Sequence, residues 1–336
     1  MGVKDLSITI FMTNQCNLRC KYCYEQNINK ESMTNEISVE NIYSTIDFIK
    51  KIGQKQCIDN FFITFHGGEP LLHFYGIKVF VKRMKQDDFF SKKKVSYGMT
   101  SNGVVLSDEM AKFIGEYIDD FSLSVDGTRE IHDSMRVDSH GYGSFEAVKI
   151  AAKKILKAKP DTKARMTVNS NSIGKFFDCL GAVIDMGFHE IVPVIDLWDK
   201  GWNETNVKLI EKFNDALLSR STDDVLVEPF IRKDIKKKRC SGGENNYCVT
   251  TDGDIYPCVV CAGDDKYRYG NVSGVLDEKV VQFVEECKNV FIDECQGCTN
   301  YDYCNGVRCI FLNEKYSGKM DQVIPMACFL EQLKFR

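Results

Sequence analysis

The sequence predicts an α/β protein, in which six βα units form an open, partial (β/α)6 barrel and a small cysteine-rich segment follows. Two observations lead to this prediction. Short apolar runs rich in β-branched residues alternate with helically spaced segments over residues 1–196, which is typical of parallel sheets built from repeated βα units. Cysteines then concentrate in residues 240–336, beyond a bridging region at 197–239.

The expected strands and helices alternate along the first part of the chain. Crossovers between parallel strands are right-handed, so we expect the helices to pack outside a curled sheet. The strands are expected at Ser7–Met12, Phe61–Phe65, Val95–Thr100, Phe121–Val125, Ala164–Asn169 and Ile191–Ile195. The helices are expected at Val39–Ile52, His73–Lys85, Asp108–Tyr117, Ser144–Leu156 and Lys175–Met186.

Three cysteines follow the first expected strand, in the run CNLRCKYC that begins at Cys16 and also contains Cys20 and Cys23. The chemistry of such barrels lies at the carboxyl ends of the strands, which is where this loop belongs. Three thiolates on one short loop can hold three irons of a [4Fe–4S] cluster and leave the fourth iron open. A zinc site is the alternative, because zinc knuckles also use closely spaced cysteines.

Polar residues follow the second and third strands as well. The segment HGGEP ends at Pro70, and its two glycines permit close backbone approach to a ligand, while Glu69 can accept from an ammonium group. Ser101 and Asn102 come directly after the third strand. A strand-to-helix turn and an ordinary Asn-Gly turn are the plainer interpretations of these two segments.

The fourth strand reads SLSVDG and ends near Ser124, and Arg136 lies twelve residues beyond that serine. An arginine can bind a carboxylate through two parallel hydrogen bonds, so this pair is a candidate carboxylate site. A helix cap and a surface arginine are the alternatives.

Together these motifs resemble the radical S-adenosylmethionine (SAM) superfamily. In that superfamily the open iron chelates the amino and carboxylate groups of SAM, and the reduced cluster releases a 5′-deoxyadenosyl radical that abstracts hydrogen. The resemblance implies that Cys16, Cys20 and Cys23 hold this cluster. It also implies a SAM site formed by Tyr22, Gly67, Gly68, Glu69, Ser101, Asn102, Ser124 and Arg136.

The C-terminal cysteines resemble the SPASM domain, an extension of radical SAM enzymes that binds two auxiliary [4Fe–4S] clusters. The resemblance implies three clusters in all. A pair of zinc ribbons is the alternative. The family usually has three residues between the last two cysteines of the central group, whereas this chain has four. By resemblance, the far cluster is held by Cys295, Cys298, Cys304 and Cys328, and the near cluster by Cys240, Cys258 and Cys309.

The fourth ligand of the near cluster is left open between Cys248 and Cys261. If neither thiol binds, an open iron can ligate a substrate cysteine, lower its pKa and accept an electron, which suits carbon–sulfur bond formation. If one of them binds, the cluster is better interpreted as an electron relay. Both are also candidate catalytic residues, as hydrogen donors in an epimerase.

The segment from Cys240 to Cys258 resembles maturases of ribosomally made peptides, particularly those that install thioether links at cysteine. We therefore predict a thioether-forming peptide maturase. The alternatives are carbon–carbon (cyclophane-type) crosslinking, epimerisation, anaerobic sulfatase maturation and a non-catalytic iron–sulfur electron-transfer protein. Sulfatase-maturating enzymes have an acidic residue where this chain has Val259, and tend to have glutamine where it has His66.

The charge and composition limit the kinds of partner that we expect for this protein. With a net charge of −4 and dispersed basic residues, we expect no nucleic-acid partner. The basic run at 232–239 is expected to be a solvated helix end. Neither a signal peptide nor an apolar run of membrane-spanning length is recognisable, so we expect a cytoplasmic protein without a membrane partner.

The resemblance implies a small ribosomal precursor peptide as substrate and an electron donor such as flavodoxin or ferredoxin. The first expected strand begins near Leu6, which leaves no room for a leader-recognition domain before it. We therefore expect either a separate leader-recognition protein or docking of the peptide on the catalytic domains.

Overall fold

The structure is a computed structural model that describes residues 4–28, 33–219, 225–231, 240–304, 307 and 309–335. The predicted basic run at 232–239 therefore lies outside the described residues, as do 305–306 and 308 between Cys304 and Cys309. Across the described ranges, no helix is both long enough and apolar enough to cross a membrane.

A ten-stranded sheet runs through the molecule in the order β10-β9-β8-β1-β2-β3-β4-β5-β6-β7. From β1 to β7 every strand is parallel to its neighbour, so the prediction of a mostly parallel partial barrel is confirmed. The short β7 comes from the predicted bridging region. The strands of this part are β1 (Asp5–Thr13), β2 (Asn60–Gly67), β3 (Lys94–Ser101), β4 (Asp120–Ser124), β5 (Lys163–Val168), β6 (Glu190–Ile195) and β7 (Leu226–Val227).

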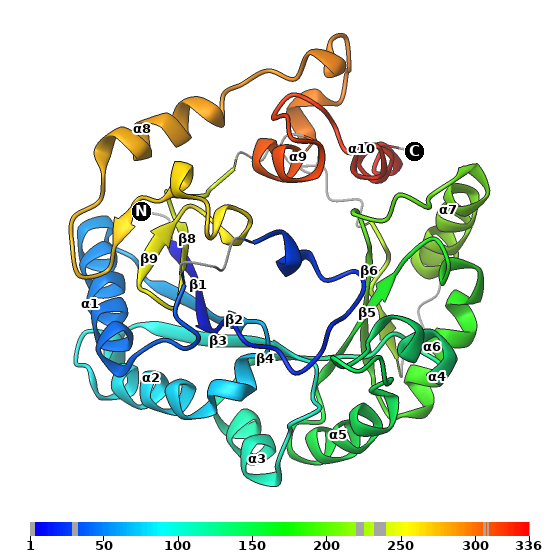
Figure 1. The fold of residues 1–336 in the computed structure, drawn as a ribbon, viewed down its shortest axis with the longest axis horizontal. Helices are drawn as coiled ribbons and strands as arrows, with labels where there is room; N and C mark the ends of the chain where they lie inside the picture. The colour runs from blue at the N-terminus through cyan, green and yellow to red at the C-terminus, as the bar shows by residue number, and fades with distance from the viewer. Residues whose placement is uncertain are drawn as a thin grey trace.

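Helices surround this sheet as an outer ring (Figure 1). The sequence did not predict the seven-residue α4, which begins after the N-cap Thr128. The helices of this part are α1 (Val39–Gln56), α2 (Phe74–Gln86), α3 (Asp108–Tyr117), α4 (Arg129–Met135), α5 (Phe145–Ala158), α6 (Phe176–Asp185) and α7 (Glu204–Ser219).

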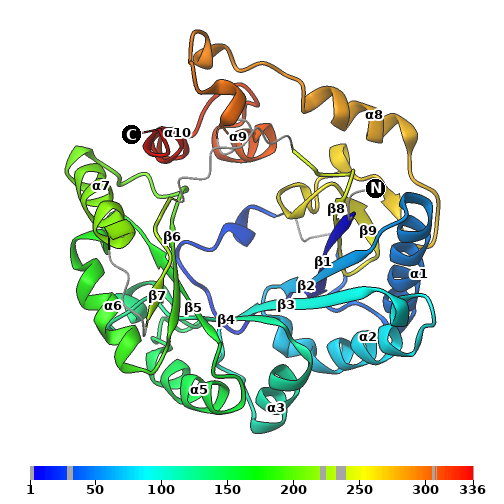
Figure 2. The same cartoon turned by 180° about the vertical axis from the view of Figure 1, so that it is seen from behind.

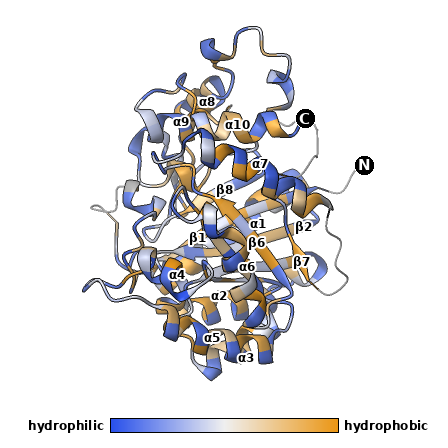
Figure 3. Ribbon diagram, turned by 90° about the vertical axis from the view of Figure 1, so that its right-hand side faces the viewer, coloured by the Kyte–Doolittle hydropathy of each residue, from blue (hydrophilic) through white to orange (hydrophobic). Residues whose placement is uncertain are grey.

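Side chains alternate across each strand, so one face of the sheet packs against the helices and the other faces the inside of the barrel. In β5, Ala164, Met166 and Val168 are buried in the core shared with the helices. Arg165 and Thr167 lie on the opposite face. Apolar residues dominate the strands in Figure 3, as expected for a sheet covered by helices.

The cysteine-rich part is continuous with the same sheet. Strand β8 (Asn246–Val249) pairs in parallel with β1, and β9 (Asp254–Tyr256) forms an antiparallel hairpin with β8. The remaining elements are β10 (Gly270–Asn271), α8 (Glu278–Cys287), α9 (Ile310–Ser317) and α10 (Pro325–Leu333). Figures 1 and 2 show α9 and α10 at the open side of the barrel, between the β8–β9 hairpin and α7.

Gly67 ends β2 with a φ of +135°, and a Cβ there would lie 2.0 Å from the carbonyl oxygen of Thr13. We expect Gly67→Ala to lower the free energy of unfolding by about 3 kcal/mol or more, because it adds backbone strain and a clash. Gly181 in α6 has no atom within 4 Å of its added Cβ. Gly181→Ala should instead stabilise by about 1 kcal/mol. Equal urea midpoints for the two variants would contradict this account.

Candidate functional site

The loop formed by residues 14–23 leaves β1 and crosses the carboxyl ends of the strands (Figure 1). Cys16, Cys20 and Cys23 are partly buried on it and line one cavity of about 510 Å³. Burial raises the pKa of Cys16 to about 11, and the charges of Glu69 and of the other two thiols add to the rise. The three thiols are therefore close neighbours, and bound metal would favour the thiolate form of Cys16.

The carboxylate of Glu69 is anchored beside this loop and is 1% exposed. It accepts hydrogen bonds from the Ser101 hydroxyl at 2.8 Å, the Asn102 backbone N–H at 2.7 Å and the Leu71 backbone N–H at 3.1 Å. The Asn102 amide also lies 3.8 Å from the Cys16 sulfur. Ser101 and Asn102 thus position Glu69 and Cys16, and their contact with a ribose stays a prediction.

Burial raises the pKa of Glu69 to about 6, although its three hydrogen bonds oppose the rise. The two glycines before it bring β2 onto the cysteine loop. A Cβ at Gly68 would lie 2.3 Å from the Gln15 carbonyl oxygen, and the Gly68 N–H donates to the Thr13 carbonyl at 3.0 Å. These glycines were predicted to permit close backbone approach to a ligand. In the structure they permit close approach of the end of β2 to the cysteine loop.

A buried ion pair occupies the end of β4. The Arg136 guanidinium donates through Nε and Nη2 to Asp126, at 2.9 Å and 3.1 Å. The Tyr22 hydroxyl and the Thr167 backbone N–H donate to the same carboxylate. Sequence reasoning gave Asp126 no role and assigned Tyr22 and Arg136 to SAM. Their contact with SAM stays a prediction, because in this structure both side chains hold Asp126.

Tyr24 and Glu25, which follow the last cysteine of the loop, meet His66 of β2. His66 Nε2 lies 2.8 Å from the Tyr24 hydroxyl and 3.2 Å from a Glu25 carboxylate oxygen. Sequence reasoning noted His66 only as a departure from a family pattern and missed the other two. The available signal was the even spacing of β2, which puts His66 on the inner face with Phe62 and Thr64.

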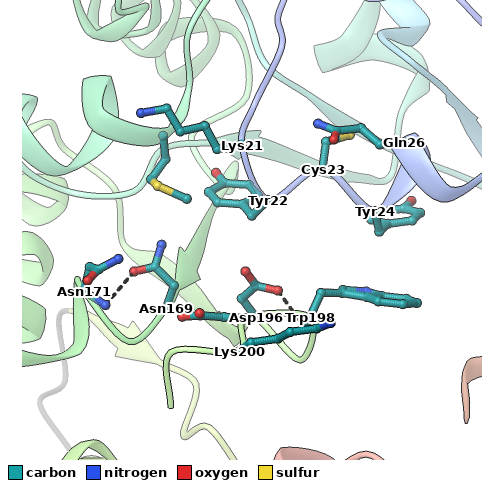
Figure 4. A pocket seen from close by; sticks show the side chains of 12 residues that line it. Lys21, Tyr22, Cys23, Tyr24, Gln26, Asn169, Asn171, Asp196, Trp198 and Lys200 are labelled. Carbon is teal, nitrogen blue, oxygen red and sulfur yellow. Dashed lines mark hydrogen bonds between the residues drawn. The ribbon is translucent and has the colours of Figure 1, made fainter. Parts of the chain in front are cut away.

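A second pocket, of about 310 Å³, lies between the cysteine loop and the ends of β5 and β6. Figure 4 shows Tyr22, Cys23 and Tyr24 on one side of this pocket and Asp196 and Trp198 on the other. Burial raises the pKa of Asp196, and the neighbouring charge of Asp199 contributes. The sequence assigned no chemical role to Asp196 or Trp198.

Four C-terminal thiols lie within electrostatic reach of one another. Cys258 and Cys261 flank a 3₁₀ turn (Val259–Cys261) with their sulfurs 3.8 Å apart, and the Cys261 thiol lowers the pKa of Cys258 to about 7. Burial raises the pKa of Cys309 to about 12, and the charges of Cys258 and Cys240 add to it. The structure therefore brings together the three predicted near-cluster residues and Cys261.

Cys248 has a different environment. It pairs with Thr9 across β8 and β1, on the inner face of the sheet, and is fully buried. Burial raises the pKa of its thiol well above the usual range, and the charges of Cys258 and Glu25 contribute.

The four predicted far-cluster residues also lie together. Burial raises the pKa of Cys295 to about 11, with contributions from Cys328, Cys304 and Cys298. Among the residues that the structure describes, no three Cys, His, Asp or Glu side chains are placed to hold a single metal ion. A [4Fe–4S] cluster binds one thiolate per iron. The ligand roles of these thiol sets stay predictions.

Comparison with known proteins agrees with this fold. Residues 10–170 match the family model described as Radical SAM superfamily. The cysteine-type anaerobic sulfatase-maturating enzyme of Clostridium novyi is 28% identical over 341 residues, covering 90% of this chain and 87% of that protein. The radical SAM cyclopropyl synthase TigE of Paramaledivibacter caminithermalis is 23% identical, covering 100% of this chain and 74% of that protein.

Two solved structures share the fold. Native anSMEcpe with bound AdoMet and Cp18Cys peptide has a TM-score of 0.76 at 21% identity, covering 98% of this chain and 96% of that one. Streptococcus suis SuiB bound to precursor peptide SuiA has a TM-score of 0.66 at 13% identity, covering 97% and 76%. The likeness to these two structures concerns the fold, and the match to the family model covers residues 10–170 of this chain.

Breaking the buried ion pair should cost stability. We expect Arg136→Ala to lower the free energy of unfolding by about 3–5 kcal/mol, because it leaves the Asp126 carboxylate buried without its cation. Arg129→Ala, which removes the exposed partner of Glu146, should cost less than about 1 kcal/mol. Chemical denaturation of both variants measures this, and a loss below 1 kcal/mol at Arg136 would refute the buried pairing.

Proposed function

We propose that this protein is a radical SAM enzyme that oxidatively modifies a peptide or protein, with a thioether crosslink as the leading product. The observation that carries the proposal is the placement of Cys16, Cys20 and Cys23 beside the anchored Glu69 at the carboxyl ends of the strands. A carboxylate next to three cluster-type thiols suits a cofactor with an ammonium group. An iron–sulfur electron carrier would have no use for that carboxylate.

The chain's own residues supply binding, orientation and exclusion of water, while the difficult chemistry belongs to the cofactors. With clusters and SAM bound, they would supply a 5′-deoxyadenosyl radical and accept one electron. The substrate loses one hydrogen atom to the radical, then one electron and one proton as the new bond forms. The net change is a loss of two hydrogens from the substrate.

Cys261 is the proposed fourth ligand of the near cluster, because its sulfur lies 3.8 Å from that of Cys258 within one short turn. A cluster closed by four thiolates has no open iron for a substrate cysteine. Its role is then to relay the electron, and the substrate sulfur attacks carbon without binding iron. The structural relatives solved with a bound peptide, anSMEcpe and SuiB, support a peptide as the substrate.

Oxidation of a cysteine in a target sulfatase is the second candidate, favoured by the relative that is 28% identical over 90% of this chain. Against it, Val259 occupies the position of the acidic residue that sulfatase-maturating enzymes use as a base. His66 replaces their usual glutamine. His66 Nε2 lies 3.2 Å from a Glu25 carboxylate oxygen, so this replacement also changes the neighbour of that carboxylate.

Mass spectrometry after anaerobic co-expression with a cysteine-containing peptide encoded beside the gene would test the proposal. A loss of two hydrogens, together with a cysteine that no longer alkylates after reduction, would establish a thioether. The same loss with reactive cysteines would indicate a carbon–carbon crosslink. A cysteine converted to an aldehyde would move the assignment to sulfatase maturation, and an unchanged mass with deuterium uptake to epimerisation.

Replacing Cys16, Cys20 and Cys23 together with Ala should abolish 5′-deoxyadenosine formation, because no iron would remain to bind SAM. Chromatographic assay of the nucleoside after chemical reduction measures this. Iron content should fall by about one cluster per chain, relative to the wild-type protein reconstituted in parallel. Continued SAM cleavage by the triple variant would show that the cluster is assigned to the wrong cysteines.

Replacing Cys304 with Ala should spare reductive SAM cleavage and stop peptide modification, because it opens only the far cluster. The matched control is Cys57→Ser, which changes an exposed thiol outside the three sets. It should leave iron content, deoxyadenosine formation and peptide modification unchanged. Full peptide modification by Cys304→Ala would remove the far cluster from the mechanism.

A further inference from the structure

We propose that the Tyr269 hydroxyl donates a hydrogen bond to a sulfur of the near cluster, on the side of Cys240, and so tunes that cluster as an electron acceptor. This inference rests on the proposed function, since it concerns one of the clusters of that enzyme. Tyr269 would then be a positioning residue, because it acts on the reaction only through the cluster. The observation that carries the inference is a buried donor that the described protein leaves unsatisfied.

Tyr269 comes directly before β10 and is fully buried. Its backbone is paired on both sides, because its N–H donates to the Ile255 carbonyl at 2.7 Å and its carbonyl accepts from the Asp277 N–H at 2.6 Å. Its hydroxyl is buried as well, yet no residue in the described ranges forms a hydrogen bond with it. A buried tyrosine hydroxyl usually has a partner, and an unpaired one costs free energy. The ring is therefore held in place with an unfilled donor at its end.

The hydroxyl end of this ring lies against the loop that follows Cys240. A Cβ added to Gly243 would lie 2.2 Å from the Tyr269 hydroxyl oxygen, and a Cβ added to Gly242 would lie 3.5 Å from the Cys240 sulfur. The hydroxyl and the thiol thus border two adjacent glycines. The Gly243 carbonyl accepts from the Tyr247 hydroxyl at 2.6 Å, so this loop already has a tyrosine that serves its backbone.

The charges around the hydroxyl agree with this geometry. Burial raises the pKa of Tyr269, so the hydroxyl stays protonated and remains a donor. Nearby groups that can carry negative charge add to the rise, and they include the thiols of Cys261 and Cys240. Two members of the near set are therefore within electrostatic reach of the unfilled donor.

A sulfur of an iron–sulfur cluster suits this donor. Hydrogen bonds to cluster sulfurs help to set the reduction potential, and they favour the reduced cluster because it carries one more negative charge. A higher potential suits a cluster that accepts the electron given up by the substrate radical. A trapped water is the alternative partner, and it would need two to four polar contacts of its own.

The test is a redox titration, monitored by electron paramagnetic resonance, of protein reconstituted anaerobically with iron and sulfide. The background is the triple variant of Cys16, Cys20 and Cys23 to Ala, in which only the auxiliary clusters give signals. Adding Cys304→Ala identifies the far-cluster signal by its loss. In the same background, Tyr269→Phe should disfavour reduction of the near cluster about tenfold, which for one electron lowers the potential by about 59 mV. The far-cluster potential should not change.

Tyr247→Phe is the matched control. Its ring centroid lies 6.4 Å from that of Tyr269, and its hydroxyl donates to a backbone carbonyl. Loss of this hydroxyl should lower the urea midpoint of the reconstituted protein and leave both cluster potentials unchanged. The control therefore separates a loss of stability in this loop from a change in the cluster.

An unchanged near-cluster potential in Tyr269→Phe would overturn the inference and assign the hydroxyl to a trapped water. Equal shifts of both clusters, or the same shift in Tyr247→Phe, would also overturn it, because they would indicate a general change in the fold. If the near-cluster potential shifts as expected but the wild-type protein modifies no peptide, the inference holds and the proposed function fails. Wild-type protein that assembles no near cluster would refute both.

Discussion

The carboxylate of Asp126 ties together four segments on which the site depends. It accepts from Tyr22 of the cysteine loop, from Arg136 after α4 and from the Thr167 backbone N–H of β5, while its own residue follows β4. A buried carboxylate is stable only when its hydrogen-bonding capacity is filled, so each partner is required. The backbone of the loop adds two bonds to the same region, from Arg19 to Val137 and from Lys21 to Met135. These bonds hold the loop against the segment that follows α4.

Glu69 is a second buried carboxylate whose hydrogen-bonding capacity is filled, at the opposite end of the loop, but its partners differ from those of Asp126. Its carboxylate accepts from the neutral donors Ser101, Asn102 and Leu71, and no cation pairs with it in the part of the chain that the structure describes. Burial raises the pKa of Glu69 to about 6. Asp126 is instead paired with Arg136. The Glu69 carboxylate therefore keeps a charge that a bound ammonium group can neutralise. The charge of Asp126 is already paired, and this carboxylate holds the segments of the site together.

The sequence predicted what depends on local pattern. The short apolar, β-branched runs identified β1 to β6, and the cysteine spacing indicated which thiols would gather. It missed α4, which at seven residues is too short for a periodic signal. It also missed contacts that need the fold: Tyr22 meets Asp126 across 104 positions, and Tyr24 meets His66 across 42. The pairing of Arg136 with Asp126 has the same origin, because spacing from Ser124 does not show which carboxylate the guanidinium holds in the fold.

The cysteine spacing left the fourth ligand of the near cluster open between Cys248 and Cys261, and these two thiols lie in different surroundings. Cys261 shares a turn with Cys258, whereas Cys248 faces the inside of the barrel opposite Thr9. If Cys261 is the fourth ligand of the near cluster, that cluster accepts an electron but does not determine which substrate atoms are joined. The side chains on the inner face of the barrel, which would surround the substrate radical, then determine the product. Because Cys248 and His66 belong to that face, substitutions there should change the product, while substitutions at Cys261 should change only how completely the reaction proceeds.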